Sequence, residues 1–151
     1  MRQNIEFKSK ESLCRGWLYI PDTVSKGETA PGIVMAHGFA GLKEMGLAGF
    51  AERFEAAGFI TLVFDYRFWG ESEGEPRNQI FALEMVEDYR NALTWLSQRP
   101  EVDSNRIGIW GTSYSGGLCL YVGTHDKRVK AVVAQVPSTL NAESRRAKAP
   151  D

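Results

Sequence analysis

The segment from Gly111 to Gly117, which reads Gly-Thr-Ser-Tyr-Ser-Gly-Gly, contains the side chain best placed to do chemistry in this sequence. Ser113 follows the apolar run 106–110 and precedes a segment with the spacing of a helix. At a sharp turn between a buried strand and a helix, a serine hydroxyl projects as a nucleophile, provided that small residues flank it. Gly111 and Ser115 lie two residues to either side, so the segment predicts a nucleophile elbow.

A glycine-rich turn after a strand has other uses, and the residues around Ser113 allow them to be weighed. Such a turn can be a plain strand-to-helix loop or a phosphate cradle, but no Lys stands in the P-loop position and Gly111-Thr112-Ser113 is not a dinucleotide fingerprint. A helix after Ser113 would also direct backbone N–H groups and its positive dipole end at an oxyanion. We therefore favour nucleophilic chemistry.

Alternating strands and helices must position this serine. Continuous apolar runs predict strands buried on both faces of a parallel sheet; the runs lie at 32–36, 59–64, 106–110 and 129–136. Alternation before them predicts two short strands near the edge of the sheet. Helical spacing predicts helices at 46–57, from Ala82 to Leu96 and after residue 117. The order predicts an α/β fold, a mostly parallel sheet flanked by helices, whose functional residues follow the carboxyl ends of the strands.

These motifs resemble the α/β-hydrolase superfamily, especially its esterase and X-prolyl-peptidase-like branches, in which Tyr follows the nucleophile. His37-Gly38-Phe39 is similar to the oxyanion loop of that family, and Asp65-Tyr66-Arg67 with Gly70-Glu71-Ser72 resembles the segment after its next strand. The resemblance covers about residues 5–138. It implies an oxyanion hole made by the backbone N–H groups of Phe39 and Tyr114. The expected supporting residues are His37, Gly38, Asp65, Gly111, Ser115 and Gly116, and Trp69 is a candidate for an acyl pocket.

The base and the acid of a triad cannot be assigned in this chain. In the α/β-hydrolase order they follow the serine, but His125 and Asp126 fall in a helix-to-strand connection at the far edge of the sheet, and Asp151 is the last residue. One explanation is that residues 1–138 form part of a hydrolase domain, truncated after about the sixth strand. Residues 139–151 would then be a polar tail or the start of a cap or second half. A second explanation is a complete gene product that has kept the scaffold and lost the chemistry. A third arrangement would combine Ser113 with His37 and Asp65.

Two functions remain open at this point. The first is a serine hydrolase of the ester, thioester or amide class, acting on a small acyl substrate through an acyl-enzyme on Ser113, with low or no activity for the isolated chain. The second is a non-catalytic module that acts by association. In both, the apolar strand Val129–Val136 would form an open sheet edge, suited to a homodimer or a complementary C-terminal fragment.

Composition excludes several other classes of protein. The 18 basic and 19 acidic residues give a net charge of -1, which does not suit a nucleic-acid binder. Cys14 and Cys119 are too few and too distant for a disulfide framework, and no run approaches the length of a membrane helix or a signal peptide. We expect a cytoplasmic protein with no membrane or nucleic-acid partner, no cofactor and no metal ion.

Overall fold

The computed structural model describes residues 2–138, which form one six-stranded sheet with helices on both faces. Residues 139–151, expected to be a tail or the start of a further segment, lie outside the described residues. The strands run β1 (Arg2–Ser9), β2 (Ser12–Tyr19), β3 (Ala30–Ala36), β4 (Ile60–Phe64), β5 (Val102–Thr112) and β6 (Val129–Gln135). Their order in the sheet is β1-β2-β4-β3-β5-β6.

The sheet is mostly parallel, as the sequence predicts. β1 and β2 form an antiparallel hairpin that pairs antiparallel to β4, whereas β3, β4, β5 and β6 run parallel to one another. The parallel strands are joined by α1 (Leu47–Ala56), α2 (Ala82–Ser97) and α3 (Tyr114–His125). The expected α/β class, with two strands at one edge of the sheet, is therefore confirmed, although β1 and β2, with 8 residues each, are longer than β3, β4 and β6.

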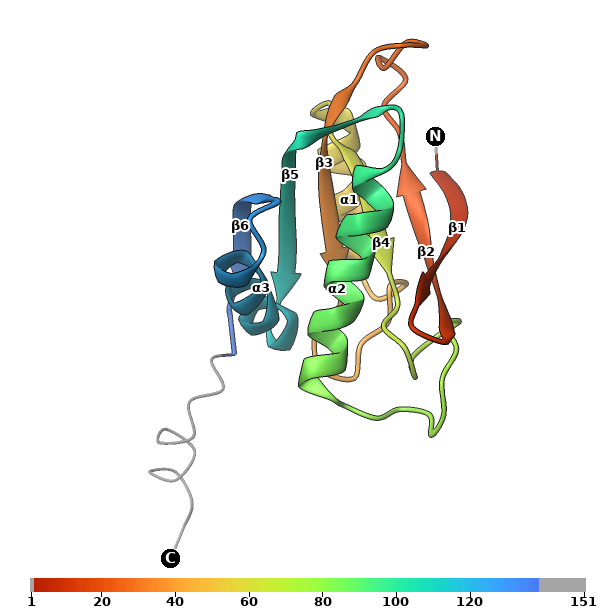
Figure 1. The fold of residues 1–151 in the computed structure, drawn as a ribbon, viewed down its shortest axis with the longest axis vertical. Coiled ribbons are helices and arrows are strands. Elements are labelled where there is room, and N and C mark those ends of the chain that lie inside the picture. The colour runs from red at the N-terminus through yellow and green to blue at the C-terminus, as the bar shows by residue number, and fades with distance from the viewer. Residues whose placement is uncertain (1, 139–151) are drawn as a thin grey trace, which may run out of the picture.

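The helices are divided unequally between the two faces. Figure 1 shows α2 and α3 over one face of the sheet and α1 behind the other. The core under α2 and α3 is the larger one and includes Leu62, Tyr89, Leu93 and Ile109. The core under α1 consists of six buried residues: Tyr19, Met35, Leu47, Ala51, Val63 and Trp110. One face of the sheet is thus more completely covered than the other.

Two strands differ from their expected form. β5 begins at Val102, so the polar residues 103–105 belong to the strand and not to a turn before it; the pairing with β3 is irregular there, between Pro31 and Gly32. β6 was expected to be buried, but each of its residues is half-buried or exposed, and Val133 is 50% exposed. The reason is position, because β6 is the outermost strand and pairs with β5 alone among the described strands.

α1 and α2 lie close to their expected bounds, whereas α3 begins at Tyr114, before the end of the glycine-rich segment that was expected to precede it. α1 ends just before Gly58, whose φ of 90° suits a glycine after a helix, and α2 covers the expected segment from Ala82. Within residues 2–138, no helix has both the length and the apolar character needed to cross a membrane.

Candidate active site

Ser113 stands at the sharp turn between β5 and α3. Its φ of 54° and ψ of -115° lie outside the regions that an L-residue normally adopts, and its side chain is exposed. Gly111 makes this turn sterically possible, because a Cβ there would come within 2.4 Å of the carbonyl oxygen of Ser115 and 2.8 Å of Cys119 Sγ. A strained, exposed serine packed this closely has the geometry of a nucleophile elbow.

The segment after β6 holds the elbow in place. The Ser113 N–H donates to the carbonyl of Gln135 over 2.9 Å, and the Ser113 carbonyl accepts from Ser138 N–H over 2.8 Å. Between them, Val136 has a φ of 44°, which is rare for a β-branched residue, and is 79% exposed. The sequence did not predict this attachment. The one nearby residue type that indicates a change of backbone direction is Pro137, which follows the strand.

Gly116 packs against the same segment. A Cβ on Gly116 would lie 3.0 Å from the Cα of Pro137 and 3.1 Å from the carbonyl oxygen of Gln135. The first turn of α3 can therefore approach the end of β6 only without a side chain at this position.

Ser115 joins the elbow to the loop after β3. Its Oγ donates to the carbonyl oxygen of His37, and it accepts a hydrogen bond from Tyr66 OH over 2.5 Å. Ser115 and Tyr66 are both completely buried. The sequence suggested Ser115 only as a small residue in a glycine position, so the role of its hydroxyl was missed.

The loop after β3 lies directly against Ser113. A Cβ on Gly38 would be 3.2 Å from Ser113 Cβ and 3.1 Å from the carbonyl oxygen of Thr112. Next in this loop is Phe39, 66% exposed, whose ring meets that of Tyr114 edge-on with centroids 6.2 Å apart. Phe39 and Tyr114, the two expected oxyanion donors, therefore come from adjacent segments beside Ser113.

His37 is buried at the base of this loop. Its Nδ1 lies 3.0 Å from the carbonyl oxygen of Gly38, and its Nε2, which has no hydrogen-bond partner, lies 3.8 Å from Asp65 Oδ1. Burial lowers the pKa of the imidazole, which favours a neutral ring at pH 7. Neither ring nitrogen is hydrogen-bonded to Ser113, so this geometry suits shaping of the loop better than proton abstraction.

Asp65 is bound by a lysine that the sequence did not single out. Lys43 donates to Asp65 through its backbone N–H and through Nζ, each over 2.8 Å, and Nζ also contacts Glu71 over 2.7 Å. Burial alone would lower the pKa of Lys43, but its hydrogen bonds to carboxylates outweigh burial and raise it. This cluster fastens the segment after β3 to the one after β4.

Arg67 lies two residues after Asp65 but pairs with Asp88 on α2. Its Nε lies 2.6 Å from Asp88 Oδ1, and its backbone N–H donates to Asp88 Oδ2 over 3.0 Å. Asp65 was expected to organise the loop by bonding either to backbone or to Arg67, and the first alternative holds: it accepts from the backbone N–H of Lys43 as well as from Lys43 Nζ. Arg67 instead attaches the same loop to α2.

Trp69 lies under the site. It is 8% exposed, its Nε1 donates to the carbonyl of Gln79 over 2.7 Å, and its ring centroid is 6.3 Å from that of His37. The indole therefore supports the long loop after β4 and the imidazole, and contact with an acyl group stays a prediction.

Two of the acid–base residues downstream of Ser113, His125 and Asp126, are engaged at the far end of α3. His125, the last residue of this helix, has Nδ1 2.8 Å from the carbonyl oxygen of Tyr121. Asp126 lies 2.6 Å from Arg128 Nη2, and these hydrogen bonds to Arg128 lower its pKa to about 2. A helix rises about 1.5 Å per residue, so the length of α3 separates both from Ser113.

Comparison with known proteins gives the family of this fold. The family described as X-Pro dipeptidyl-peptidase (S15 family) matches residues 17–147. The quorum-quenching protein AidA of Acinetobacter baumannii is 43% identical over 137 residues, which are 90% of this chain and 44% of AidA. The thiohydrolase aneE of Aspergillus aculeatus is 39% identical over 134 residues, 88% of this chain and 41% of aneE.

A solved structure shows the same arrangement. The α/β-hydrolase GrgF from a Penicillium species superposes with a TM-score of 0.85 at 34% identity, covering 97% of this chain and 50% of GrgF. The chain thus spans less than half the length of the two curated relatives and half of the solved one. The matched part corresponds to the N-terminal half of the fold.

Proposed function

This chain belongs to the X-Pro dipeptidyl-peptidase (S15) family of α/β-hydrolases, and from that premise we propose that it supplies the nucleophile and the oxyanion loop of a serine hydrolase. Its substrates would be small esters, thioesters or amides, attacked at the acyl carbonyl by Ser113 Oγ. The name thiohydrolase, which one relative carries, supports thioesters among these substrates.

One observation carries the proposal: an exposed serine in a left-handed turn has the oxyanion loop packed against it. Ser113 has a φ of 54°, and a Cβ on Gly38 would lie 3.2 Å from Ser113 Cβ. A plain strand-to-helix loop has no need of a strained non-glycine residue. Backbone N–H groups of Phe39 and Tyr114 on either side would stabilise the negative charge that forms during attack.

The chemistry proceeds in two balanced steps. Ser113 Oγ bonds to the acyl carbon while its proton passes to a base, and the carbonyl oxygen becomes the oxyanion. Collapse of this intermediate breaks the bond to the leaving group, which takes up the proton, and leaves an acyl-serine. Water then attacks the acyl-serine and releases the acid. Neither His37 nor His125 is hydrogen-bonded to Ser113. We therefore assign the base and its orienting acid to the region of the relatives that this chain does not span.

The test is the rate at which a fluorophosphonate modifies Ser113 in the folded chain, followed by peptide mass spectrometry. Ser104, which is also exposed, serves as an internal reference. We expect Ser113 to be modified at least tenfold faster than Ser104, because the elbow and the oxyanion donors stabilise the attack. Ser113→Ala should abolish the rapidly formed fluorophosphonate adduct, and Ser104→Ala should leave it unchanged. Equal rates at the two serines would contradict the proposal and favour a non-catalytic module acting by association.

A further inference from the structure

Tyr66 contacts both of the segments that flank Ser113. It follows the end of β4, and its side chain is completely buried. Its hydroxyl lies 2.5 Å from Ser115 Oγ, in the first turn of α3. Its ring meets the imidazole of His37 edge-on, with centroids 4.9 Å apart. One side chain therefore joins the elbow to the loop after β3.

The two hydrogen bonds of Ser115 Oγ have a fixed direction. Ser115 Oγ donates to the carbonyl oxygen of His37, which can only accept. Because a serine hydroxyl carries one hydrogen, the hydrogen shared with Tyr66 must come from the phenol. Burial raises the pKa of Tyr66 well above its usual value, so the phenol keeps this hydrogen at neutral pH. The donors therefore run in one direction, from Tyr66 through Ser115 to His37.

The carbonyl at the end of this series belongs to the loop that carries the candidate oxyanion donor. The carbonyl of His37 and the N–H of Gly38 share one peptide plane, and a Cβ on Gly38 would lie 3.2 Å from Ser113 Cβ. The next peptide plane joins the carbonyl of Gly38 to the N–H of Phe39, and that carbonyl lies 3.0 Å from His37 Nδ1. Holding His37 in place therefore also holds the direction of the Phe39 N–H.

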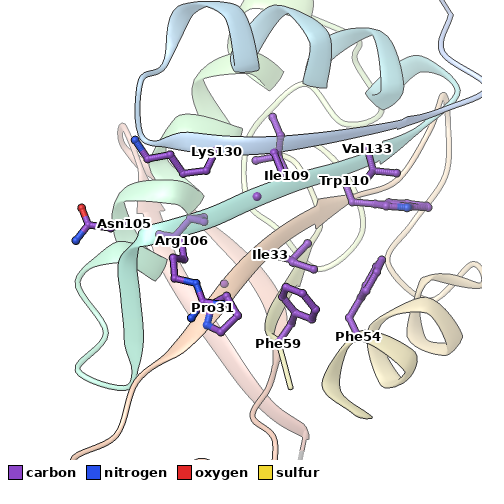
Figure 2. Close-up of a pocket in the computed structure, with 14 residues that line it drawn as sticks. Pro31, Ile33, Phe54, Phe59, Asn105, Arg106, Ile109, Trp110, Lys130 and Val133 are labelled. Atoms are coloured by element: carbon purple, nitrogen blue, oxygen red, sulfur yellow. The ribbon is translucent and has the colours of Figure 1, made fainter. Parts of the chain in front are cut away.

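Tyr66 packs in the larger core, and the other end of β4 lies away from it. The ring of Tyr66 meets those of Phe64 and Tyr89 edge-on, with centroids 5.2 and 5.8 Å away. The α1 face has a separate apolar pocket of about 400 Å³, and Figure 2 shows Phe54 and Phe59 among the side chains that line it. Phe59 directly precedes β4, so a change there perturbs the same strand at the end opposite to Tyr66.

We propose that Tyr66 is a positioning residue that sets the reactivity of Ser113 by holding the elbow and the loop after β3 in one arrangement. The inference rests on the proposed function, in which the Phe39 N–H stabilises the charge that forms during attack. A phenylalanine would fill the same space but would leave Ser115 Oγ without its donor, so the serine hydroxyl could turn away from His37. Small errors in the position of reacting groups slow a reaction strongly.

The experiment measures how fast a fluorophosphonate modifies Ser113 in the whole 151-residue chain at several concentrations of the reagent. This series separates the affinity for the reagent from the rate constant of the chemical step. In Tyr66→Phe the rate constant should fall about tenfold while the affinity stays the same, because the change affects positioning and not binding.

Phe59→Leu is the matched control for a general loss of stability. The ring of Phe59 meets that of Phe54 edge-on, with centroids 6.3 Å apart, and this contact is lost in the variant. Phe59→Leu should lower the midpoint of thermal unfolding, as Tyr66→Phe does, but should leave the rate constant for Ser113 unchanged.

Hydrogen exchange tests the same link without chemistry at Ser113. The Gly41 N–H donates to the carbonyl of Gly38 over 3.2 Å, so its exchange reports how firmly the loop is held. Tyr66→Phe should speed this exchange about fivefold, whereas Phe59→Leu should not. The double variant Tyr66→Phe/Ser115→Ala should exchange no faster than Ser115→Ala, since both changes break one link.

Three results would overturn the positioning role of Tyr66. The first is a rate constant that Tyr66→Phe leaves unchanged or that Phe59→Leu lowers as much. The second is exchange at Gly41 that does not respond to Tyr66→Phe. The third is a double variant in which the effects of the two changes multiply. Failure of the proposed function looks different, because Ser113 would then react no faster than Ser104 in the unaltered chain, and the proposal for Tyr66 would fail with it.

Discussion

Gly38 and Ser113 are in such close approach that the two residues constrain each other. A Cβ on Gly38 would stand 3.2 Å from Ser113 Cβ and 3.1 Å from the carbonyl oxygen of Thr112, tighter than most real contacts. The loop that carries the candidate oxyanion donor can reach Ser113 only because position 38 has no side chain. The spacing between Ser113 and this candidate donor is therefore set by a glycine.

Gly38→Ala should displace the loop and slow the modification of Ser113 by a fluorophosphonate about ten- to a hundredfold, because small errors in the position of reacting groups are costly. Gly49→Ala, in α1, is the control: a Cβ there meets no atom within 4 Å, so the rate should not change. If the fluorophosphonate modified Ser113 in Gly38→Ala as fast as in the unaltered chain, the loop would have no part in activating Ser113.

The contributions of the Ser115 and Tyr66 hydroxyl groups to the free energy of unfolding should depend on each other. Ser115→Ala removes the hydrogen bond to the carbonyl of His37 and the acceptor of Tyr66 OH, both buried, and should cost about 1–3 kcal/mol. Tyr66→Phe in that background should cost less than it does alone. Urea unfolding of the two single variants and the double variant measures the coupling, and strictly additive changes would show that the hydroxyls act independently.

The Lys43–Asp65 pair should matter far more than an ion pair at the surface. Lys43→Met leaves the carboxylate of Asp65 buried without its cation, which should destabilise the fold by about 3 kcal/mol. Lys10→Met is the matched control, because Lys10 is 60% exposed beside Glu87, and should cost less than about 0.5 kcal/mol. If the two variants lowered the midpoint of thermal unfolding equally, burial of Lys43 would add nothing to the stability that the ion pair contributes.

Asp126 should make stability depend on acid pH. Hydrogen bonds to Arg128 lower its pKa from 3.8 to about 2, so the folded state binds the proton more weakly than the unfolded state. Its contribution, about 1–2 kcal/mol, is therefore complete above pH 4 and is lost as the pH falls toward 2.

Urea unfolding of the unaltered chain and of Asp126→Asn measures this contribution. The difference between their free energies of unfolding should be greatest near pH 7 and shrink steadily below pH 4. A difference that is the same at pH 3 and pH 7 would contradict this assignment.

The parallel strands and the elbow could be predicted from the sequence because their signals are local. The apolar run before Ser113 and the glycines around it lie within a few residues of one another, and each follows from sterics and burial alone. The exposure of β6 could not be predicted in this way. Its apolar run is the same whether or not another element covers it, since burial depends on what packs against a strand.

The supporting polar contacts were missed because their partners are distant in the sequence. Lys43 is 22 residues from Asp65 and 28 from Glu71, and a lysine in a polar loop normally indicates a solvated side chain. Ser115 is 78 residues from His37. Residue type and spacing specify neither contact, so only the fold could show that these side chains join the loops around the site.

The hydrogen bond from Ser138 N–H to the carbonyl of Ser113 also bears on how this scaffold can diversify. The segment after β6 is anchored to Ser113 itself. An insertion directly after Ser138 would therefore begin at the mouth of the site and could change its lining without disturbing a strand, the elbow or the oxyanion loop. Lengthening the chain at this junction gives evolution, or an engineer, a direct way to change what surrounds Ser113 while the serine itself stays in place.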